Sequence, residues 1–262
     1  MEFFSHAGIR LAYQVDGDAD RPSLVLVNSL GTDLRMWQPL VPILTRQFRV
    51  IRYDARGHGQ SALAPAPYTI QDLGQDLLAL LDTLRLERVS ICGLSLGGLT
   101  ALWFAAQYPQ RVQRAVFANT AARIGSREIW DARIAAVRAG GMASIREAVL
   151  ARFLSAHYRQ EHPETVREIG EMLLALDPQG YIAACEVLRE TDLSSLVRTI
   201  AVPALILAGE LDESTPPAQS EELHAAITGS QLFIFAQVAH LSSLERPEVF
   251  SQLLLEFVAG RF

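Results

Sequence analysis

The stretch Arg88–Trp103, RVSICGLSLGGLTALW, decides the fold of this chain. It begins with a short apolar run typical of a buried strand, turns at Gly93–Gly97 and continues into residues that favour a helix. The turn has the pattern G-x-S-x-G, which places a serine at the tip of a sharp strand-to-helix turn. We therefore predict that Ser95 is an exposed nucleophile at a helix N-terminus, where free N–H groups favour developing negative charge. The alternative is an idle serine in a glycine-rich turn, so the rest of the chain must supply a base, an acid and an oxyanion hole.

Strands and helices alternate on both sides of this turn. After an antiparallel hairpin element at Ile9–Val15, apolar runs predict strands at residues 24–27, 49–53, 89–92, 115–118, 204–208 and 231–235. Helices are expected between them, including one at 37–47. Residues 121–192 break the alternation, because they predict only helices, at 128–139, 144–157, 164–176 and 178–190. A parallel sheet interrupted by such an insertion is an α/β core that carries a helical cap.

Two candidate partners of Ser95 follow expected strands, at the sheet edge where ligands of parallel sheets bind. Asp212 comes shortly after the strand at 204–208, and His240 comes shortly after the strand at 231–235. His240 would accept the proton of the attacking serine, while Asp212 would hold the imidazole in the right tautomer and stabilise its charged form.

The chain order serine, acid, histidine is that of the α/β-hydrolases. We therefore predict the α/β-hydrolase fold, with a mostly parallel sheet, helices on both faces and a helical cap inserted after the sixth strand. The core would comprise residues 1–120 and 193–262, and the cap residues 121–192.

The acid has alternatives in its own loop. Glu210 and Glu213 are close in sequence to Asp212, although position favours Asp212. Asn119 stands where another variant of the fold places its acid, but an amide cannot carry that charge.

Among the six histidines, only His240 follows the final strand. His58 lies in the loop Arg56–Gly59, where a turn-stabilising role is favoured over catalysis. His157 and His162 have no further ligands nearby, so we predict no metal site, and no motif implies a cofactor.

An oxyanion hole requires two backbone N–H groups. One is expected from Leu96, directly after the nucleophile. The other is expected from Leu30, in the loop after the strand at 24–27. That loop reads Asn28-Ser29-Leu30, not the commoner His-Gly-x, but the substitution does not remove a backbone donor.

Composition limits the partners and the location. The 262 residues are 50% hydrophobic, enough for one large domain, and the net charge of −6 without a basic run argues against nucleic acid. Cys92 and Cys185 form neither a disulfide framework nor a metal-binding pair. The N-terminus does not resemble a signal peptide and no apolar run reaches about 18 residues, so we expect a cytoplasmic protein without a membrane partner. The sequence does not indicate an oligomeric state.

Four blocks resemble the 3-oxoadipate enol-lactonases: Asn28–Trp37, Arg52–Ser61, Cys92–Thr100 and Asn119–Ser126. The likeness extends over essentially the whole chain. It implies hydrolysis of 3-oxoadipate enol-lactone to 3-oxoadipate by a serine triad through an acyl-enzyme, in the β-ketoadipate pathway of aromatic catabolism. A general carboxylesterase, a carbon–carbon bond hydrolase, and a ligand-binding protein of the same fold without turnover are the alternatives.

The substrate that this resemblance implies is a small anionic lactone, and the insertion is rich in arginine. We favour Arg133 as the residue that binds the carboxylate, because it follows Trp130 by about one helical turn and could share its face. Arg123, Arg127 and Arg138 are the other candidates. Any of these arginines could instead belong to a solvated helix face, and Trp130 could be either a pocket wall or part of the cap core.

Overall fold

The computed structural model describes residues 1–261. Its sheet has eight strands in the order β1-β2-β4-β3-β5-β6-β7-β8. β2 pairs antiparallel with both β1 and β4, and all other neighbours are parallel. The strands are β1 (Glu2–His6), β2 (Ile9–Asp16), β3 (Ser23–Val27), β4 (Arg49–Tyr53), β5 (Val89–Leu94), β6 (Val112–Ala118), β7 (Ala204–Gly209) and β8 (Gln231–Phe235).

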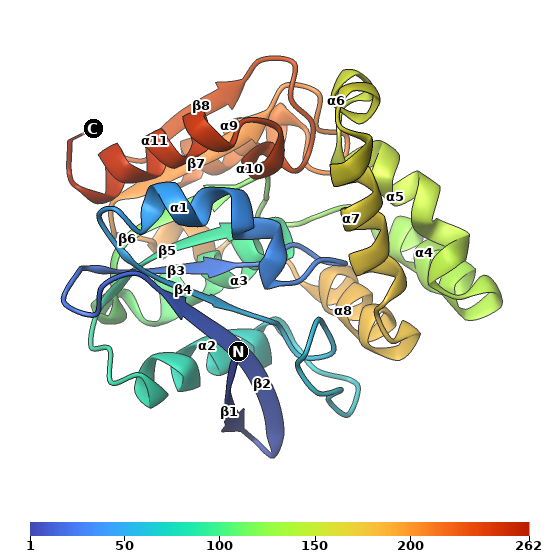
Figure 1. The fold of residues 1–262 in the computed structure, drawn as a ribbon, viewed down its shortest axis with the longest axis horizontal. Helices are drawn as coiled ribbons and strands as arrows, with labels where there is room; N and C mark the ends of the chain where they lie inside the picture. The colour runs from blue at the N-terminus through green and yellow to red at the C-terminus, as the bar shows by residue number, and fades with distance from the viewer. Residues whose placement is uncertain (262) are drawn as a thin grey trace.

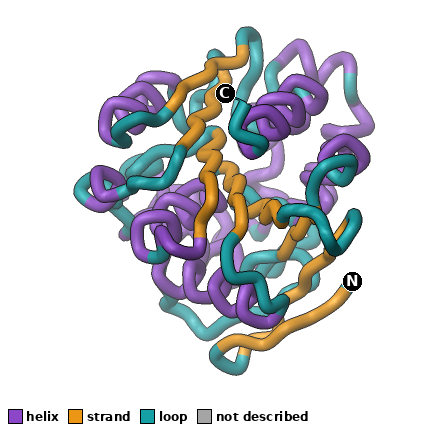
Figure 2. Tube along the Cα trace, turned by 90° about the vertical axis from the view of Figure 1, so that its left-hand side faces the viewer, coloured by secondary structure: helices purple, strands orange, loops and turns teal. Residues whose placement is uncertain are grey.

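The central strands form the core because they are apolar along their whole length. Every residue of β5 and β7 is buried, as expected for parallel strands covered on both faces. Figure 1 shows α2 and α3 on one face of the sheet and α1 and α11 on the other, and Figure 2 shows the twisted sheet between its helices. The core helices are α1 (Val41–Leu44), α2 (Ile70–Thr83), α3 (Leu96–Gln107), α9 (Pro217–Ala226), α10 (Ser242–Glu245) and α11 (Pro247–Val258).

Five α-helices come between β6 and β7. In Figure 1 they lie together on one side of the sheet, beyond the ends of the parallel strands. This arrangement agrees with the predicted fold and with a cap inserted after the sixth strand; the cap boundaries at 121 and 192 stay a prediction. The helices are α4 (Arg127–Gly140), α5 (Arg146–Phe153), α6 (Ala156–Glu161), α7 (Pro163–Leu174) and α8 (Pro178–Glu190).

Two helix predictions are wrong, because each expected helix is divided into shorter segments. The helix expected at 37–47 is a 3₁₀ helix, Leu34–Leu40, followed by the short α1. Pro39 and Pro42 account for this, since proline lacks the N–H that a continuous α-helix requires.

The helix expected at 144–157 is also broken. A 3₁₀ helix at Met142–Ile145 leads into α5, and Leu154 is then extended, with φ −129° and ψ 137°. The Ser155 hydroxyl accepts a hydrogen bond from the Tyr158 N–H and so begins α6 as a separate helix. Across residues 1–261, no helix is both long enough and apolar enough to span a bilayer.

Candidate active site

Ser95 lies at the tip of the turn between β5 and α3. Its backbone has φ 59° and ψ −117°, a strained conformation for a residue with a side chain. A Cβ on Gly93 would lie 2.1 Å from the Gly97 carbonyl oxygen, and a Cβ on Gly97 would lie 2.1 Å from the Val27 carbonyl oxygen. Both glycines are therefore required for the turn to close, as the sequence pattern predicts.

Asp212 and His240 form a buried pair. Asp212 Oδ2 lies 2.8 Å from His240 Nδ1, and the two residues are only 3% and 1% exposed. The backbone N–H groups of Ser214 and Thr215 donate to Asp212 Oδ1 at 2.8 and 3.0 Å, and the Thr215 hydroxyl donates to Oδ2 at 2.8 Å. Burial raises the pKa of the Asp212 carboxyl, but the charge of His240 and these hydrogen bonds outweigh it, so the pKa lies below its usual value. The carboxylate is therefore ionised beside the imidazole.

Asn119 supports Asp212 from the end of β6. Its Nδ2 donates to Asp212 Oδ2 at 3.0 Å and to the Ala239 carbonyl oxygen at 3.3 Å. Its Oδ1 accepts a 2.5 Å hydrogen bond from the Ser242 hydroxyl. Asn119 was expected only to be unable to serve as the acid. In the structure its side-chain amide instead binds the Asp212 carboxylate.

The prediction that Ser95 is exposed is wrong: it is only 6% exposed, and it lines, together with His240, one cavity of about 80 Å³ beneath the cap. The Phe153 ring of α5 stacks on the imidazole, with centroids 5.6 Å apart and planes at 26°. Within residues 1–261, Ser95 and His240 are not joined by a direct hydrogen bond. Such bonds are often long in ligand-free enzymes and tighten when substrate binds. The arrangement thus provides a hydroxyl, an imidazole and a carboxylate in the order that a serine hydrolase uses.

The two expected oxyanion donors lie beside this cavity or beside Ser95. Leu96 is the first residue of α3, and the first N–H groups of a helix have no acceptor within it. Leu30 lines the cavity from the loop after β3. Neither amide has an acceptor among the described residues, so both are available to a ligand oxygen.

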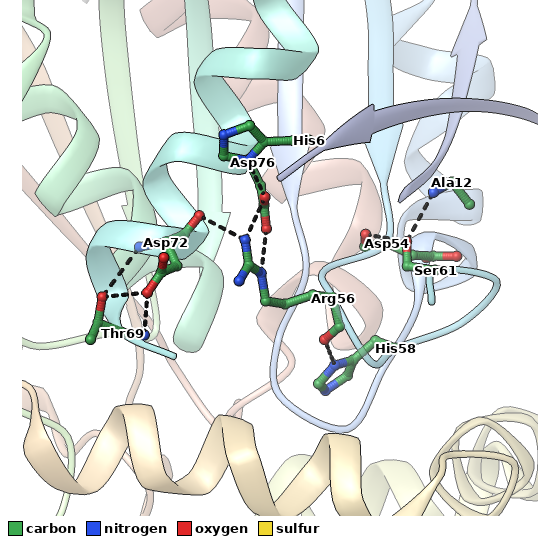
Figure 3. A network of polar contacts seen from close by, with 9 residues as sticks. All are labelled: His6, Ala12, Asp54, Arg56, His58, Ser61, Thr69, Asp72 and Asp76. Atoms are coloured by element: carbon green, nitrogen blue, oxygen red, sulfur yellow. Dashed lines mark hydrogen bonds and ion pairs between the residues drawn. The ribbon is translucent and has the colours of Figure 1, made fainter. Parts of the chain in front are cut away.

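His58 stabilises the loop that contains Leu30. The Gly31 N–H donates to His58 Nε2 at 3.3 Å, and His58 Nδ1 lies 3.2 Å from the Arg56 carbonyl oxygen, as a donor. Burial lowers the pKa of His58, which keeps the ring neutral and able to accept. The Arg56 guanidinium is in turn bound by both Asp76 oxygens of α2 at 2.7 Å (Figure 3). His58 therefore has the turn-stabilising role that the sequence favours.

Trp130 and Arg133 of α4 both line the cavity. Trp130 Nε1 donates to the Ile124 carbonyl oxygen at 2.6 Å, and Arg133 Nη1 donates to the Tyr181 hydroxyl at 3.1 Å. The other three arginines considered face the surface, where acidic residues lie near them: Arg123 with Asp192, Arg127 with Glu190 and Arg138 with Glu186. For Arg127 and Arg138, a solvated helix face is the correct interpretation, whereas Arg123 is exposed in the loop that precedes α4.

Comparison with known proteins places this geometry in a family. Residues 22–247 match the model of the alpha/beta hydrolase fold. The chain belongs to the α/β-hydrolase family. It is 37% identical over 254 residues to 3-oxoadipate enol-lactonase 2 of Acinetobacter baylyi, covering 97% of this chain and 94% of that protein.

Solved structures give the same assignment for this α/β-hydrolase. The enol-lactonase from Burkholderia xenovorans LB400 superimposes with a TM-score of 0.97 at 40% identity, covering 98% of this chain and 100% of the other. A thermophilic esterase from Thermogutta terrifontis, with malate bound, gives 0.90 at 29% identity, covering 99% and 97%. These findings confirm the predicted fold, the resemblance to enol-lactonases and the prediction that the protein is a hydrolase.

Sequence reasoning missed Arg152 of this α/β-hydrolase. Its side chain lines the same cavity from the end of α5, next to Phe153, and it has neither an ion pair nor a hydrogen bond within residues 1–261. Its only signal in the sequence was an arginine in an expected cap helix. Among residues 1–261, Glu213 is the one acidic residue that lines the cavity. Among the described residues, no group of histidine, cysteine and acidic side chains is placed to hold a metal ion.

Proposed function

We propose that the protein hydrolyses 3-oxoadipate enol-lactone to 3-oxoadipate through an acyl-enzyme. Ser95 attacks the ring carbonyl while His240 accepts its proton and Asp212 stabilises the imidazolium. The Leu30 and Leu96 amides bind the developing oxyanion. The A. baylyi and B. xenovorans relatives, enol-lactonases by name, support this substrate.

Collapse of the tetrahedral intermediate opens the lactone ring. The bond that breaks joins the acyl carbon to the ring oxygen, which leaves as an enolate. An enolate is a better leaving group than an alkoxide, and protonated His240 delivers a proton to it. The imidazole, now neutral, then activates a water molecule that releases the acyl group from Ser95 as a carboxylate.

The observation that carries the proposal is a pair of guanidinium groups in the cavity of Ser95. Arg133 is held only by a neutral hydroxyl, and Arg152 has no partner among residues 1–261. Two arginines and Glu213 leave this lining with one excess positive charge, which matches the single carboxylate of the lactone. Guanidinium groups bind carboxylates through paired, charge-assisted hydrogen bonds. Arg133 thus remains our proposed anchor, Arg152 joins it, and Trp130 forms a wall.

Cavity size supports a small substrate. A volume of about 80 Å³ is far below the roughly 300–1,000 Å³ of pockets that enclose drug-sized ligands. A general carboxylesterase or a carbon–carbon bond hydrolase would use the same triad, but neutral ester substrates would not require two arginines that lack an acidic partner. We further propose that the enzyme acts in the β-ketoadipate pathway and in the cytoplasm.

The first test is the loss of enol-lactone absorbance with wild-type protein and Ser95→Ala. We expect turnover by the wild type and a fall of several orders of magnitude in the variant, as for other serine triads. A loss below about tenfold would mean that Ser95 is not the nucleophile. Failure of the wild type to turn over any activated ester would favour a ligand-binding protein.

The second test separates the lactone from neutral esters. Arg152→Gln and Arg133→Gln should each raise KM for the enol-lactone by about 10- to 150-fold, since a hydrogen bond to a charged group contributes about 1.5–3 kcal/mol. Hydrolysis of 4-nitrophenyl acetate should stay within about threefold of wild type. Arg138→Gln, a surface change in the same helix as Arg133, is the matched control. Equal losses on both substrates would contradict an anionic substrate.

A further inference from the structure

The link between α5 and α6 contacts the loop that carries His240. The Leu241 N–H donates to the Phe153 carbonyl oxygen at 2.8 Å, next to the stacking of the Phe153 ring on His240. Two residues further along the chain, Ser155 is bound to Glu245. The break in the expected cap helix therefore lies where the cap meets the catalytic histidine.

Glu245 is a buried carboxylate without a positively charged partner within residues 1–261. It is 5% exposed and ends α10. Its Oε1 accepts from the N–H groups of Ser155 and Ala239, both at 3.0 Å, and its Oε2 accepts from the Ser155 hydroxyl at 2.5 Å. Burying a charge is costly unless hydrogen bonds compensate it, and three converging donors do so here.

These contacts fix the residue that precedes His240. Glu245 holds the Ala239 N–H, while Asn119 donates to the Ala239 carbonyl oxygen at 3.3 Å. A Cβ on Gly209 would lie 2.1 Å from that same oxygen, so β7 packs directly against it. Both backbone polar groups of Ala239 are thus bound, one to Glu245 and one to the amide that also holds Asp212.

We propose that Glu245 is a positioning residue for His240. By binding the cap at Ser155 and the histidine loop at Ala239 with one carboxylate, it fixes the imidazole between Asp212 and Ser95. This proposal rests on the proposed catalytic role of His240. Because a displacement of about 1 Å can cost about 100-fold in rate, loss of this contact acts on kcat, whereas substrate affinity, which depends on Arg133 and Arg152, is retained.

Three substitutions of Glu245 separate the effect of its side-chain geometry from the effect of its charge. Glu245→Ala removes all three acceptor contacts. Glu245→Asp keeps the charge but is one CH₂ shorter, so it does not reach both Ser155 and Ala239. Glu245→Gln removes the charge but keeps the shape: its oxygen accepts from the two N–H groups, and its NH₂ donates to the Ser155 hydroxyl, which can accept.

The experiment measures kcat and KM per folded molecule, with 4-nitrophenyl acetate and with the enol-lactone. We expect kcat to fall about 100-fold in Glu245→Ala and at least tenfold in Glu245→Asp, with KM within threefold. Glu245→Gln should stay within threefold of the wild-type kcat. Leu254→Ala, a buried α11 residue, is the control for general destabilisation and should lower the melting temperature but not kcat.

Wild-type kcat in both Glu245→Ala and Glu245→Asp would overturn the proposal and leave Glu245 a purely structural residue. A loss in Glu245→Gln equal to that in Glu245→Ala would also overturn it, because a side chain of the same shape and reach would then not suffice to position His240. Ser95→Ala in the same series separates the two proposals. Retained activity there contradicts the triad, whereas lost activity there with full activity in Glu245→Ala and Glu245→Asp contradicts only the role of Glu245.

Discussion

Asp212→Asn is the sharpest test of the acid in the proposed triad. All groups around the carboxylate are donors, and those at Oδ1 are backbone N–H groups that cannot turn away. The amide oxygen of asparagine must therefore take the Oδ1 position. Its NH₂ then faces His240 Nδ1, which can only accept from it, so the ring proton moves to Nε2. An imidazole in that tautomer cannot take the proton of Ser95.

The wrong tautomer costs about 10⁴ in kcat for triads of this geometry, or about 5 kcal/mol of transition-state stabilisation. The assay is kcat for enol-lactone hydrolysis, with circular dichroism to confirm folding. Glu210→Gln is the matched control, since Glu210 binds Gln237 at the surface of the same loop and should keep kcat within threefold. A loss below tenfold in Asp212→Asn, or a large loss in Glu210→Gln, would refute the assignment of Asp212.

Two further predictions concern stability. Gly97→Ala should lower the free energy of unfolding by about 3 kcal/mol or more, because its Cβ would lie 2.1 Å from the Val27 carbonyl oxygen. The control is Gly229→Ala, where a Cβ meets nothing within 4 Å but φ is +74°, and it should cost only about 1–2 kcal/mol. Equal costs for the two substitutions would contradict the steric argument. Burial raises the pKa of Asp54 from 3.8 to about 6, against the N–H groups of Gln60 and Leu34, which lower it. The folded state then holds this proton longer than the unfolded state, so the contribution of Asp54 to stability falls by about 3 kcal/mol as pH rises from about 3 to 7. Urea unfolding across this range should show that fall in the wild type relative to Asp54→Asn, and a pH-independent difference would contradict it.

The parts of the site that a short pattern determines were predictable from the sequence. The G-x-S-x-G turn has steric requirements that only glycine meets at Gly93 and Gly97, so it identifies the strand, the helix and Ser95 together. Asp212 and His240 follow from strand order, because residues after parallel strands meet at one edge of the sheet.

The parts that depend on tertiary contacts were not predictable. No glycine or proline marks the break at Leu154, which exists because Ser155 turns toward Glu245, 90 residues later in the sequence. Arg152 and Arg133 look alike in the sequence as arginines of cap helices; only the packing of α5 over His240 brings Arg152 into the cavity. From the sequence, Asn119 likewise only occupies a position where a related fold has its acid. Its role depends on its contact with Asp212, which only the structure shows.

The burial of both cysteines has a practical consequence for following this enzyme in solution. Cys92 lies in β5 and Cys185 in α8, and burial raises the pKa of both thiols, that of Cys185 to about 12. Neither is a thiolate accessible to maleimide reagents in the native fold. A cysteine introduced at the exposed Ile129, on α4 at the rim of the cavity, would thus be the reactive thiol to which a fluorophore attaches. Such a label would report ligand binding at the cavity without first removing a native cysteine.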